Sequence, residues 1–300
     1  MISHNQGAQS SFGACAFFLV ALGVAIIPAG ARAQVVSTEL CADQMVVAVV
    51  GAGRLTALSP QARDPRLSVV AAQDEGGAAV LPPAAEAFVL ANAKVVVGMA
   101  WDKTRALALM ERLGARIIRL DVPDDFAAIA ALLRSFAVAL GVPERGESLA
   151  ADLERRVAAL AARQPAQPVR AIYLRPDGGS AGWGTFVDAV LTAAGFENAI
   201  TAPGWIRLDL ETLVMNPPKV IIAAFFDSPG WSRLFSRHPV FRTLWHEVPV
   251  IEVPGALMAC GAWPLIIAAE RLAHHRLSNA GLGTRSRTEG ATTSPGVGLF

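Results

Sequence analysis

Residues 94–102 read KVVVGMAWD and residues 219–227 read KVIIAAFFD, so one short pattern occurs twice with an offset of 125 residues. In each copy a lysine precedes a run of apolar, largely β-branched residues, which is typical of a strand buried on both faces of a parallel sheet. Each copy ends with an aromatic residue followed by aspartate, where a loop should begin. A glutamate stands eight residues before each lysine, at the expected start of a short helix: Glu86 and Glu211.

The duplication predicts an α/β fold with two similar lobes, each built on a mostly parallel sheet. One long α-helix is expected to bridge the lobes, because residues 143–163 carry an apolar stripe at Leu149, Leu153, Val157 and Leu160. A ligand cleft between the lobes follows from this arrangement. The alternative interpretation is that ordinary helix–strand units have converged on similar patterns.

The two ends of the chain differ from the rest in composition. Residues 14–27 are almost wholly apolar but too short to span a bilayer comfortably, and residues 31–33 read ARA, a pattern that precedes signal-peptide cleavage. No Lys or Arg precedes the apolar run, which departs from that pattern. We expect cleavage after Ala33, a mature start at Gln34 and export of the mature protein. The predicted segments are a signal peptide (1–33), an N-terminal lobe (34–141), a bridging helix (142–164), a C-terminal lobe (165–278) and a disordered tail (279–300).

Composition and charge exclude some classes of function. The formal net charge is only +1, so there is no electrostatic basis for binding nucleic acid. The chain has six Trp but one Tyr, and large rigid rings suit a pocket for a bulky, partly apolar ligand. All histidines beyond the signal peptide lie in the second half of the chain, so a metal site shared between the lobes is not expected. The alternative for each Trp is a place in the core.

Catalytic motifs are weak in this sequence. It contains no Gly-x-Ser-x-Gly motif and no phosphate-binding loop, so we expect no catalytic residues, no cofactor and no enzyme activity. The two cysteines after the signal peptide are Cys41 and Cys260, which could form a disulfide in an oxidising compartment or remain as two buried thiols. The rival hypothesis is a secreted enzyme that uses Cys41 as its nucleophile. A third hypothesis is an adaptor that binds another protein through its apolar surface.

Aromatic residues are concentrated in the predicted loops and just beyond strand ends. Ligands of open α/β sheets bind at the carboxyl ends of strands, so this placement favours a binding role for several of these rings. Arg175 lies beside such a loop and could contact a carboxylate or phosphate. The predicted ligand-binding residues are Cys41, Trp101, Asp102, Arg175, Trp183, Trp205, Phe226, Trp231 and Trp263.

Four stretches together resemble a known family. They are VVSTELCADQ (35–44), AGWGT (181–185), GFENA (195–199) and residues 253–272, which run from VPG through CG to AERL. In order and spacing they are similar to the periplasmic substrate-binding proteins of ABC importers, of the iron–siderophore and vitamin B12 class. The resemblance covers residues 35–277. It implies two α/β lobes joined by one long helix, and a periplasmic, monomeric receptor that captures a ferric siderophore or corrinoid and delivers it to a permease.

The resemblance also implies roles for particular residues. In that family an acidic residue on each lobe docks to arginines of the permease, and Glu86 and Glu211 match those positions. Trp205 matches a pocket tryptophan of the B12-binding member, and Trp101 falls close to another. The alternative for each glutamate is a helix N-terminal acid, which favours the helix dipole by ~0.3–1 kcal/mol.

Overall fold

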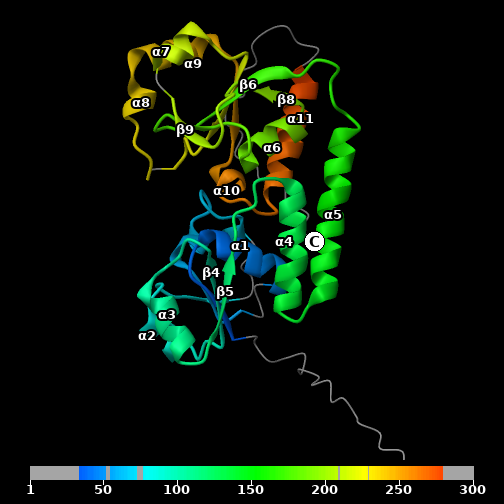
Figure 1. Cartoon of the computed structure of the whole chain (residues 1–300). Coiled ribbons are helices and arrows are strands. Elements are labelled where there is room, and N and C mark those ends of the chain that lie inside the picture. The colour runs from blue at the N-terminus through cyan, green and yellow to red at the C-terminus, as the bar shows by residue number, and fades with distance from the viewer. Residues whose placement is uncertain (1–33, 52–54, 73–76, 209, 229, 280–300) are drawn as a thin grey trace, which may run out of the picture. The chain divides into compact units, whose positions relative to one another are not determined.

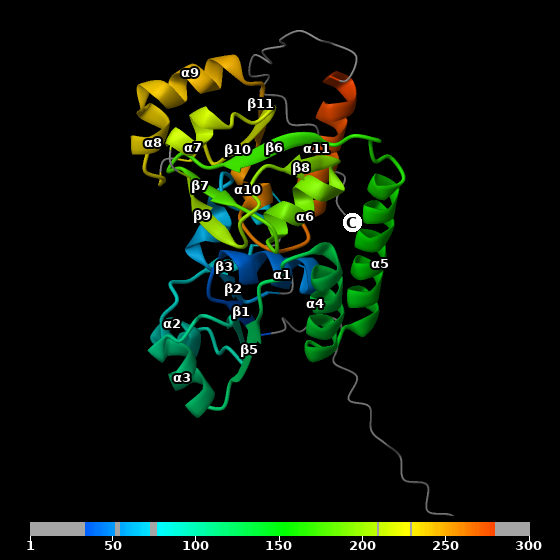
Figure 2. The same cartoon turned by 45° about the horizontal axis from the view of Figure 1, so that its top comes forward.

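The computed structural model describes residues 34–51, 55–72, 77–208, 210–228 and 230–279 (Figures 1 and 2). The expected signal peptide lies outside the described residues, as does the expected tail beyond Asn279. None of the helices in the described ranges has the length and apolar character needed to cross a membrane.

The N-terminal lobe is built on a five-stranded sheet with the order β3-β2-β1-β4-β5, in which all paired strands are parallel. Its strands are β1 (Val35–Ser37), β2 (Ala57–Leu58), β3 (Ala79–Val80), β4 (Val95–Met99) and β5 (Arg116–Leu120). Its helices are α1 (Leu40–Val50), η2 (Pro60–Arg63), η3 (Val69–Ala72), α2 (Ala85–Leu90) and α3 (Arg105–Arg112).

The sequence pattern of β4 explains its place in the sheet. Val97 belongs to the main hydrophobic core, whereas its neighbour Val96 belongs to a second core on the opposite face. Successive side chains of a strand point to opposite faces, so a run without polar residues must be covered on both sides. The central position of β4, between β1 and β5, provides that cover.

Two antiparallel-packed helices connect the lobes: α4 (Phe126–Ala139) and α5 (Pro143–Ala161). The predicted apolar stripe of the long helix is buried at Leu149, Leu153 and Leu160. On the exposed side, the Arg134 guanidinium forms ion pairs with two glutamates of α5. The long helix is therefore packed along its length rather than spanning solvent.

The C-terminal lobe has a four-stranded parallel sheet with the order β11-β10-β6-β8 and an antiparallel pair, β7 with β9. Its strands are β6 (Val169–Leu174), β7 (Gly179–Ala181), β8 (Phe196–Asn198), β9 (Trp205–Arg207), β10 (Val220–Ala224) and β11 (Val250–Val253). Its helices are α6 (Phe186–Ala193), α7 (Leu210–Met215), α8 (Leu234–Arg237), α9 (Pro239–Glu247), α10 (Gly255–Met258) and α11 (Leu265–Asn279).

The sequence repeat corresponds to a structural repeat. Strands β4 and β10 begin and end at positions that differ by the same 125 residues as the two sequence copies. Strand β10 lies between β6 and β11, as β4 lies between β1 and β5. The predicted fold class, two similar α/β lobes with mostly parallel sheets, is therefore confirmed.

Candidate functional site

Arg175 follows the carboxyl end of β6, and the local sequence fixes its position. The N–H of Gly178 donates to the Arg175 carbonyl (3.0 Å), and the Arg175 N–H donates to the Gly179 carbonyl (2.9 Å). Gly178 has φ +84°, a left-handed conformation that glycine adopts without a steric penalty. Asp177 completes the turn by accepting the Gly179 N–H (3.0 Å).

The pairing of β7 with β9 then brings a tryptophan to this arginine. Ala181 is opposite Trp205 in that pair, and Gly179 is opposite Arg207. The guanidinium carbon of Arg175 lies 5.8 Å from the Trp205 ring centroid and 4.4 Å from that of Trp231. A cation this close to an indole ring gains ~0.5–2 kcal/mol, depending on how far it is desolvated.

The charge of Arg175 is only partly compensated within the described residues. Its Nε lies 3.4 Å from Asp177 Oδ1, and this buried nitrogen has no hydrogen-bond partner there. The other oxygen of Asp177 is 3.5 Å from Arg207 Nη2, so the carboxylate is shared between two arginines. The guanidinium is thus suited to bind an anionic or carbonyl group of a ligand.

Further rings support the two indoles. The Trp205 ring packs edge-on against Phe186 (5.2 Å between centroids) and Tyr173 (6.5 Å). The Trp231 ring packs against Phe225 (5.2 Å). Burial raises the pKa of Tyr173 above its usual range, so this phenol stays neutral. We refer to Arg175 with Trp205 and Trp231 as the arginine cradle.

Two glycines show that the supporting rings lie near the N-terminal lobe. A Cβ on Gly261 would stand 2.6 Å from the Pro123 carbonyl oxygen and 3.2 Å from the Phe186 ring. A Cβ on Gly255 would stand 2.5 Å from the Phe225 ring and 3.0 Å from the Arg66 carbonyl oxygen. Both supporting rings therefore lie where the backbones of the two lobes approach closely.

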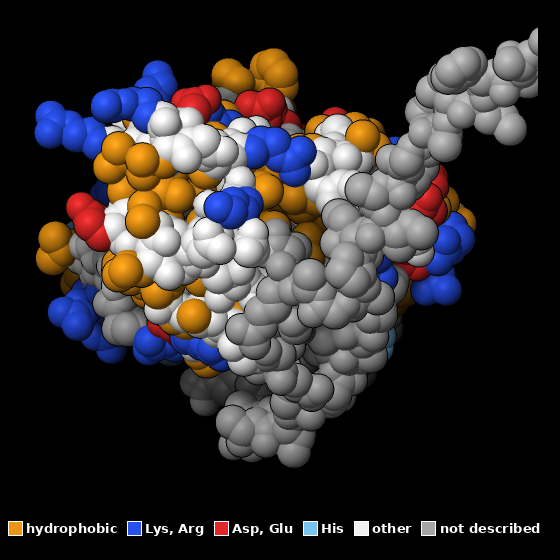
Figure 3. All heavy atoms as spheres, turned by 90° about the horizontal axis from the view of Figure 1, so that it is seen from below, with side chains coloured by type: hydrophobic (Ala, Val, Ile, Leu, Met, Phe, Trp, Pro, Cys, Tyr) orange, Lys and Arg blue, Asp and Glu red, His pale blue; other side chains and the backbone are white. Residues whose placement is uncertain are grey.

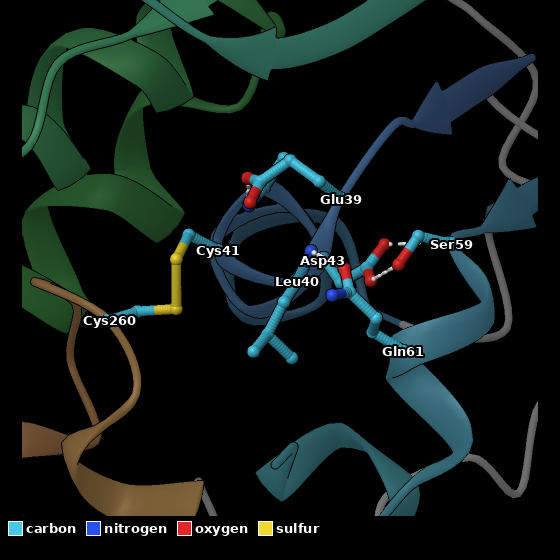
Figure 4. Close-up of a disulfide and its surroundings, with 8 residues drawn as sticks. Glu39, Leu40, Cys41, Asp43, Ser59, Gln61 and Cys260 are labelled. Carbon is cyan, nitrogen blue, oxygen red and sulfur yellow. Dashed lines mark hydrogen bonds between the residues drawn. A yellow bond between two sulfur atoms is a disulfide. The ribbon is translucent and has the colours of Figure 1, made fainter. Parts of the chain in front are cut away.

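A disulfide joins the lobes in the same region (Figure 4). Cys41, in the first turn of α1, is bonded to Cys260, with 5.5 Å between their Cα atoms. Of the two alternatives that the sequence left open, the structure contains the disulfide. A disulfide sulfur has no free thiolate, so Cys41 cannot act as the nucleophile that the rival hypothesis required.

Two carboxylates, one half-buried and one buried, lie at the start of α1. Glu39 caps this helix by accepting the Ala42 N–H (2.8 Å), and burial raises the pKa of its carboxyl. Asp43 is fully buried, and desolvation raises its pKa too, although Ser37 and Ser59 donate hydrogen bonds to it. These bonds link α1 to the ends of β1 and β2.

The remaining predicted residues occupy different surroundings. Trp101 and Trp183 are exposed, and neither ring belongs to the described group around Arg175. Asp102 accepts hydrogen bonds from the Thr38 hydroxyl (3.2 Å) and the Thr104 N–H (3.0 Å), and so holds the loop after β4.

Two predicted aromatic residues pack into the protein instead. The Phe226 ring is half-buried and packs against the core of the C-terminal lobe, with its centroid 4.7 Å from that of Trp245 and 6.5 Å from that of Phe241. Trp263 is buried in the main core, and its Nε1 donates to the Gln44 carbonyl (3.2 Å). Neither ring packs against Arg175, Trp205 or Trp231 in the described contacts, so we leave both out of the candidate site.

The sequence reasoning missed Phe186 and Phe225, which support the indoles, and Asp177, which partly neutralises Arg175. Phe225 is adjacent to the predicted Phe226, so the sequence indicated an aromatic contact here but did not show which of the two rings makes it.

Glu86 and Glu211 are exposed in the first turns of α2 and α7. Among the described residues, no group of three His, Cys, Asp or Glu side chains gathers to hold a metal ion.

Comparison with known proteins gives a consistent picture at the level of fold. No protein-family model matches the sequence, and no curated protein matches it. Among solved structures, the periplasmic haem-binding protein HutB of Vibrio cholerae matches 80% of this chain and 97% of its own length, at 14% identity and a TM-score of 0.65. The periplasmic haem-binding protein RhuT from Roseiflexus sp. RS-1 matches 81% of this chain and 100% of its own length, at 22% identity and a TM-score of 0.59.

A third match is the periplasmic vitamin B12-binding protein BtuF of Vibrio cholerae, over 83% of this chain and 97% of that one, at 17% identity and a TM-score of 0.60. At such low identities the likeness is one of fold. It agrees with the strand orders described above and with the resemblance seen in the sequence. The chain therefore has the two-lobe fold of the periplasmic solute-binding proteins that serve ABC importers.

Proposed function

We propose that this protein is a periplasmic receptor, not an enzyme, that captures a bulky metal chelate and delivers it to the permease of an ABC importer. The observation that carries this proposal is the arginine cradle, a guanidinium within 6 Å of two indole rings at the carboxyl end of a strand. Flat aromatic faces suit the apolar part of such a ligand, and the partly compensated charge of the guanidinium suits a peripheral anionic or amide group.

Ferric siderophores and corrinoids are the ligand classes that the sequence resemblance implies. The structural neighbours that bind haem or vitamin B12 add haem to these candidates. All three are chelates that bring their own metal, so the receptor need not supply a complete set of metal ligands, although the axial positions of haem iron stay open to a protein side chain. Trp101, Asp102 and Trp183 remain proposed contacts from the neighbouring loops. Glu86 and Glu211 are proposed to dock the receptor, as a monomer, to the permease.

The test is a tryptophan-fluorescence titration of the mature protein with haemin, cyanocobalamin and a panel of ferric siderophores. Arg175→Met should weaken binding of a carboxylate-bearing chelate at least tenfold, because it removes a charge-assisted hydrogen bond worth ~1.5–3 kcal/mol. Asp177 keeps Arg207 as a partner in this variant, so no carboxylate is left unpaired. Trp205→Ala should weaken binding by a similar factor.

The control is Arg112→Met, which removes an exposed arginine from α3 in the other lobe. It should leave affinity unchanged. Failure of the wild-type protein to bind any member of the panel would contradict the proposed function. Unchanged affinity in Arg175→Met would move the binding site away from the arginine cradle.

A further inference from the structure

Arg207 lies beside the arginine cradle, and the proposed function gives it no role. It follows Trp205 by two residues in β9, so the two side chains project from the same face of that strand. Gly179 is the residue opposite Arg207 in β7. A Cβ on Gly179 would collide with the Arg175 guanidinium, so this guanidinium fills the place beside Arg207 that a side chain at position 179 would take. The register of the β7–β9 pair therefore sets two arginines next to each other.

Asp177 provides a negative charge between these two arginines. Its Oδ1 is 3.4 Å from Arg175 Nε, and its Oδ2 is 3.5 Å from Arg207 Nη2. Both distances exceed the usual length of a charge-assisted hydrogen bond, and Oδ1 also accepts the Gly179 N–H (3.0 Å). The carboxylate thus compensates one positive charge while it engages few of the N–H donors of the two guanidinium groups. We call Arg175, Asp177 and Arg207 the charge triad.

The exposure of the three side chains indicates which of them a ligand can reach. The Arg207 side chain is 71% exposed and that of Arg175 24%, whereas that of Asp177 is only 11% exposed. A ligand therefore contacts the guanidinium groups more readily than the carboxylate. Asp177 acts on such a ligand mainly through its charge.

The surroundings of the charge triad add no strong field of their own. The whole chain has a net charge of only +1, and basic and acidic side chains are interspersed on the face of the molecule seen in Figure 3. The loop after β10 contributes opposite charges, Asp227 and Arg233, and Arg233 Nη2 donates to the Phe226 carbonyl (2.6 Å). Salt screens exposed charges that lie farther away than ~8–10 Å. The potential felt by a ligand here is therefore set chiefly by the charge triad.

We infer that Asp177 is a specificity-determining residue of the proposed receptor. It limits the charge triad to one net positive charge, so the site prefers a chelate that presents a single anionic group there, bound by Arg175 and Arg207 together. This inference rests on the proposed function. A carboxylate close to the ligand repels each negative charge that the ligand carries, so its effect on affinity grows with the charge of the chelate.

The first experiment is Asp177→Asn in the mature protein. The amide oxygen of asparagine can still accept the Gly179 N–H, so the turn is kept while the charge is lost. Tryptophan fluorescence measures binding of a triply negative ferric tris-catecholate and of an uncharged ferric tris-hydroxamate. The affinity for the first relative to the second should rise about tenfold or more, because only the charged chelate loses a repulsion. Haemin and its dimethyl ester form a second pair, which differs only in carboxylate charge.

Arg207→Met tests the opposite sign. It removes an exposed side chain, and Asp177 keeps Arg175 as its partner. The affinity for the charged chelate relative to the uncharged one should fall about threefold or more. This variant also carries the test if Asp177→Asn fails to show a cooperative thermal transition.

Glu197→Gln is the matched control, because it removes a carboxylate from the same lobe. Glu197 is exposed on β8, opposite Arg170 at the amino end of β6, which is roughly 16 Å along the strand from Arg175. The relative affinity for the two chelates should keep its wild-type value in this variant. A change equal to that of Asp177→Asn would show that the total charge of the protein is responsible.

The second experiment needs no chelate. Iodide and acrylamide both quench tryptophan fluorescence, but only iodide is charged. Trp231 lies 4.4 Å from the Arg175 guanidinium carbon, so Asp177→Asn should raise the quenching constant of iodide relative to that of acrylamide. The rise should shrink at high salt, because salt screens the interaction. It should be absent when Trp205 and Trp231 are both replaced by Phe.

An unchanged relative affinity for the two chelates in Asp177→Asn, or an equal change for both, would overturn the inference. Iodide quenching that does not respond to Asp177→Asn would overturn it as well, since the carboxylate would then not set the local charge. Failure of the wild type to bind any chelate would instead refute the proposed function, while the iodide experiment would still show whether Asp177 controls the charge of the triad. The two failures are therefore distinguishable.

Discussion

At the residue scale, the clearest energetic conflict lies at Asp43. This carboxyl is fully buried at the start of α1, where it accepts hydrogen bonds from the Ser59 N–H (3.0 Å), the Ser59 hydroxyl (2.5 Å) and the Ser37 hydroxyl. Desolvation outweighs these bonds and raises its pKa above the ordinary value of 3.8. Burial raises the pKa of Glu39 in the same way. Hydrogen bonds thus hold the start of α1 in place, although burying the carboxylate charge is itself unfavourable.

Asp43→Asn should change how stability depends on pH. A raised folded pKa means that the folded state keeps its proton longer than the unfolded state, so this contribution to stability is present below pH ~3.8 and is lost as pH rises through the folded value. The stability of Asp43→Asn relative to wild type should therefore increase with pH across that window. Urea unfolding from pH 3.5 to 7 measures this difference.

Asp64→Asn supplies a control of opposite sign. Hydrogen bonds from Arg66 lower the pKa of Asp64, so that carboxylate stabilises the folded state above its unfolded pKa and loses the effect as pH falls. The stability of this variant relative to wild type should decrease as pH rises. A stability of Asp43→Asn relative to wild type that stays constant or falls as pH rises would contradict the assignment at Asp43.

At the scale of elements, the close approach of α4 and α5 depends on a glycine. Gly146 is buried in the second turn of α5, and a Cβ there would stand 2.3 Å from the Ala137 Cβ and 2.8 Å from the Leu133 carbonyl oxygen. Glycine inside a helix costs ~0.5–1 kcal/mol relative to alanine. Here the packing of the two helices outweighs that intrinsic preference.

Gly146→Ala should therefore destabilise the protein, although the same change on an exposed helix face would stabilise it. Overpacking costs ~1–3 kcal/mol, which corresponds to a fall in Tm of roughly 2–4 °C per kcal/mol for a protein of this size. Ser148→Ala, at an exposed position of α5, is the matched control and should leave Tm unchanged or slightly raised. A stabilised Gly146→Ala variant would show that the helices separate easily.

At the scale of the whole molecule, the Cys41–Cys260 disulfide closes a loop with a sequence separation of 219 residues. The Trp263 indole bonds to the Gln44 carbonyl beside it, so a covalent and a polar link occur together. The chain-entropy model assigns roughly 5 kcal/mol to a closed loop of this length, and ~2–4 kcal/mol is typical in practice. The disulfide is thus positioned to restrict movement of the two lobes relative to each other.

Removal of this link should lower stability by ~2–4 kcal/mol and weaken chelate binding, because the lobes lose part of their preorganisation. Guanidinium unfolding of the wild type with and without a reductant measures the effect, and the variant with Cys41→Ser and Cys260→Ser should be insensitive to the reductant. Rapid reaction of both thiols with a chromogenic disulfide in the folded, untreated mature protein would show that the bond is absent.

The sequence allowed the lobes to be predicted because their signals are local. A strand with the run VVV, as in β4, must be buried on both faces in any fold, and the equivalent run in β10 must be buried for the same reason. The arginine cradle could be predicted only in part. Arg175, Trp205 and Trp231 were each named as ligand contacts, but their grouping follows from the β7–β9 pairing and from the loop after β10.

The sequence by itself determined the α/β class, the repeat and the helical connection, since periodicity and β-branched runs act through neighbouring residues. Only the tertiary structure decided that Cys41 joins Cys260, that Trp263 is buried, and that Phe225 rather than Phe226 supports Trp231. Adjacent side chains at a strand end point to opposite faces, and partners more than 200 residues apart meet only through packing of the whole chain. The physical reason is that the sequence pattern determines which residues must be buried, whereas the three-dimensional path of the backbone determines which residues become their neighbours.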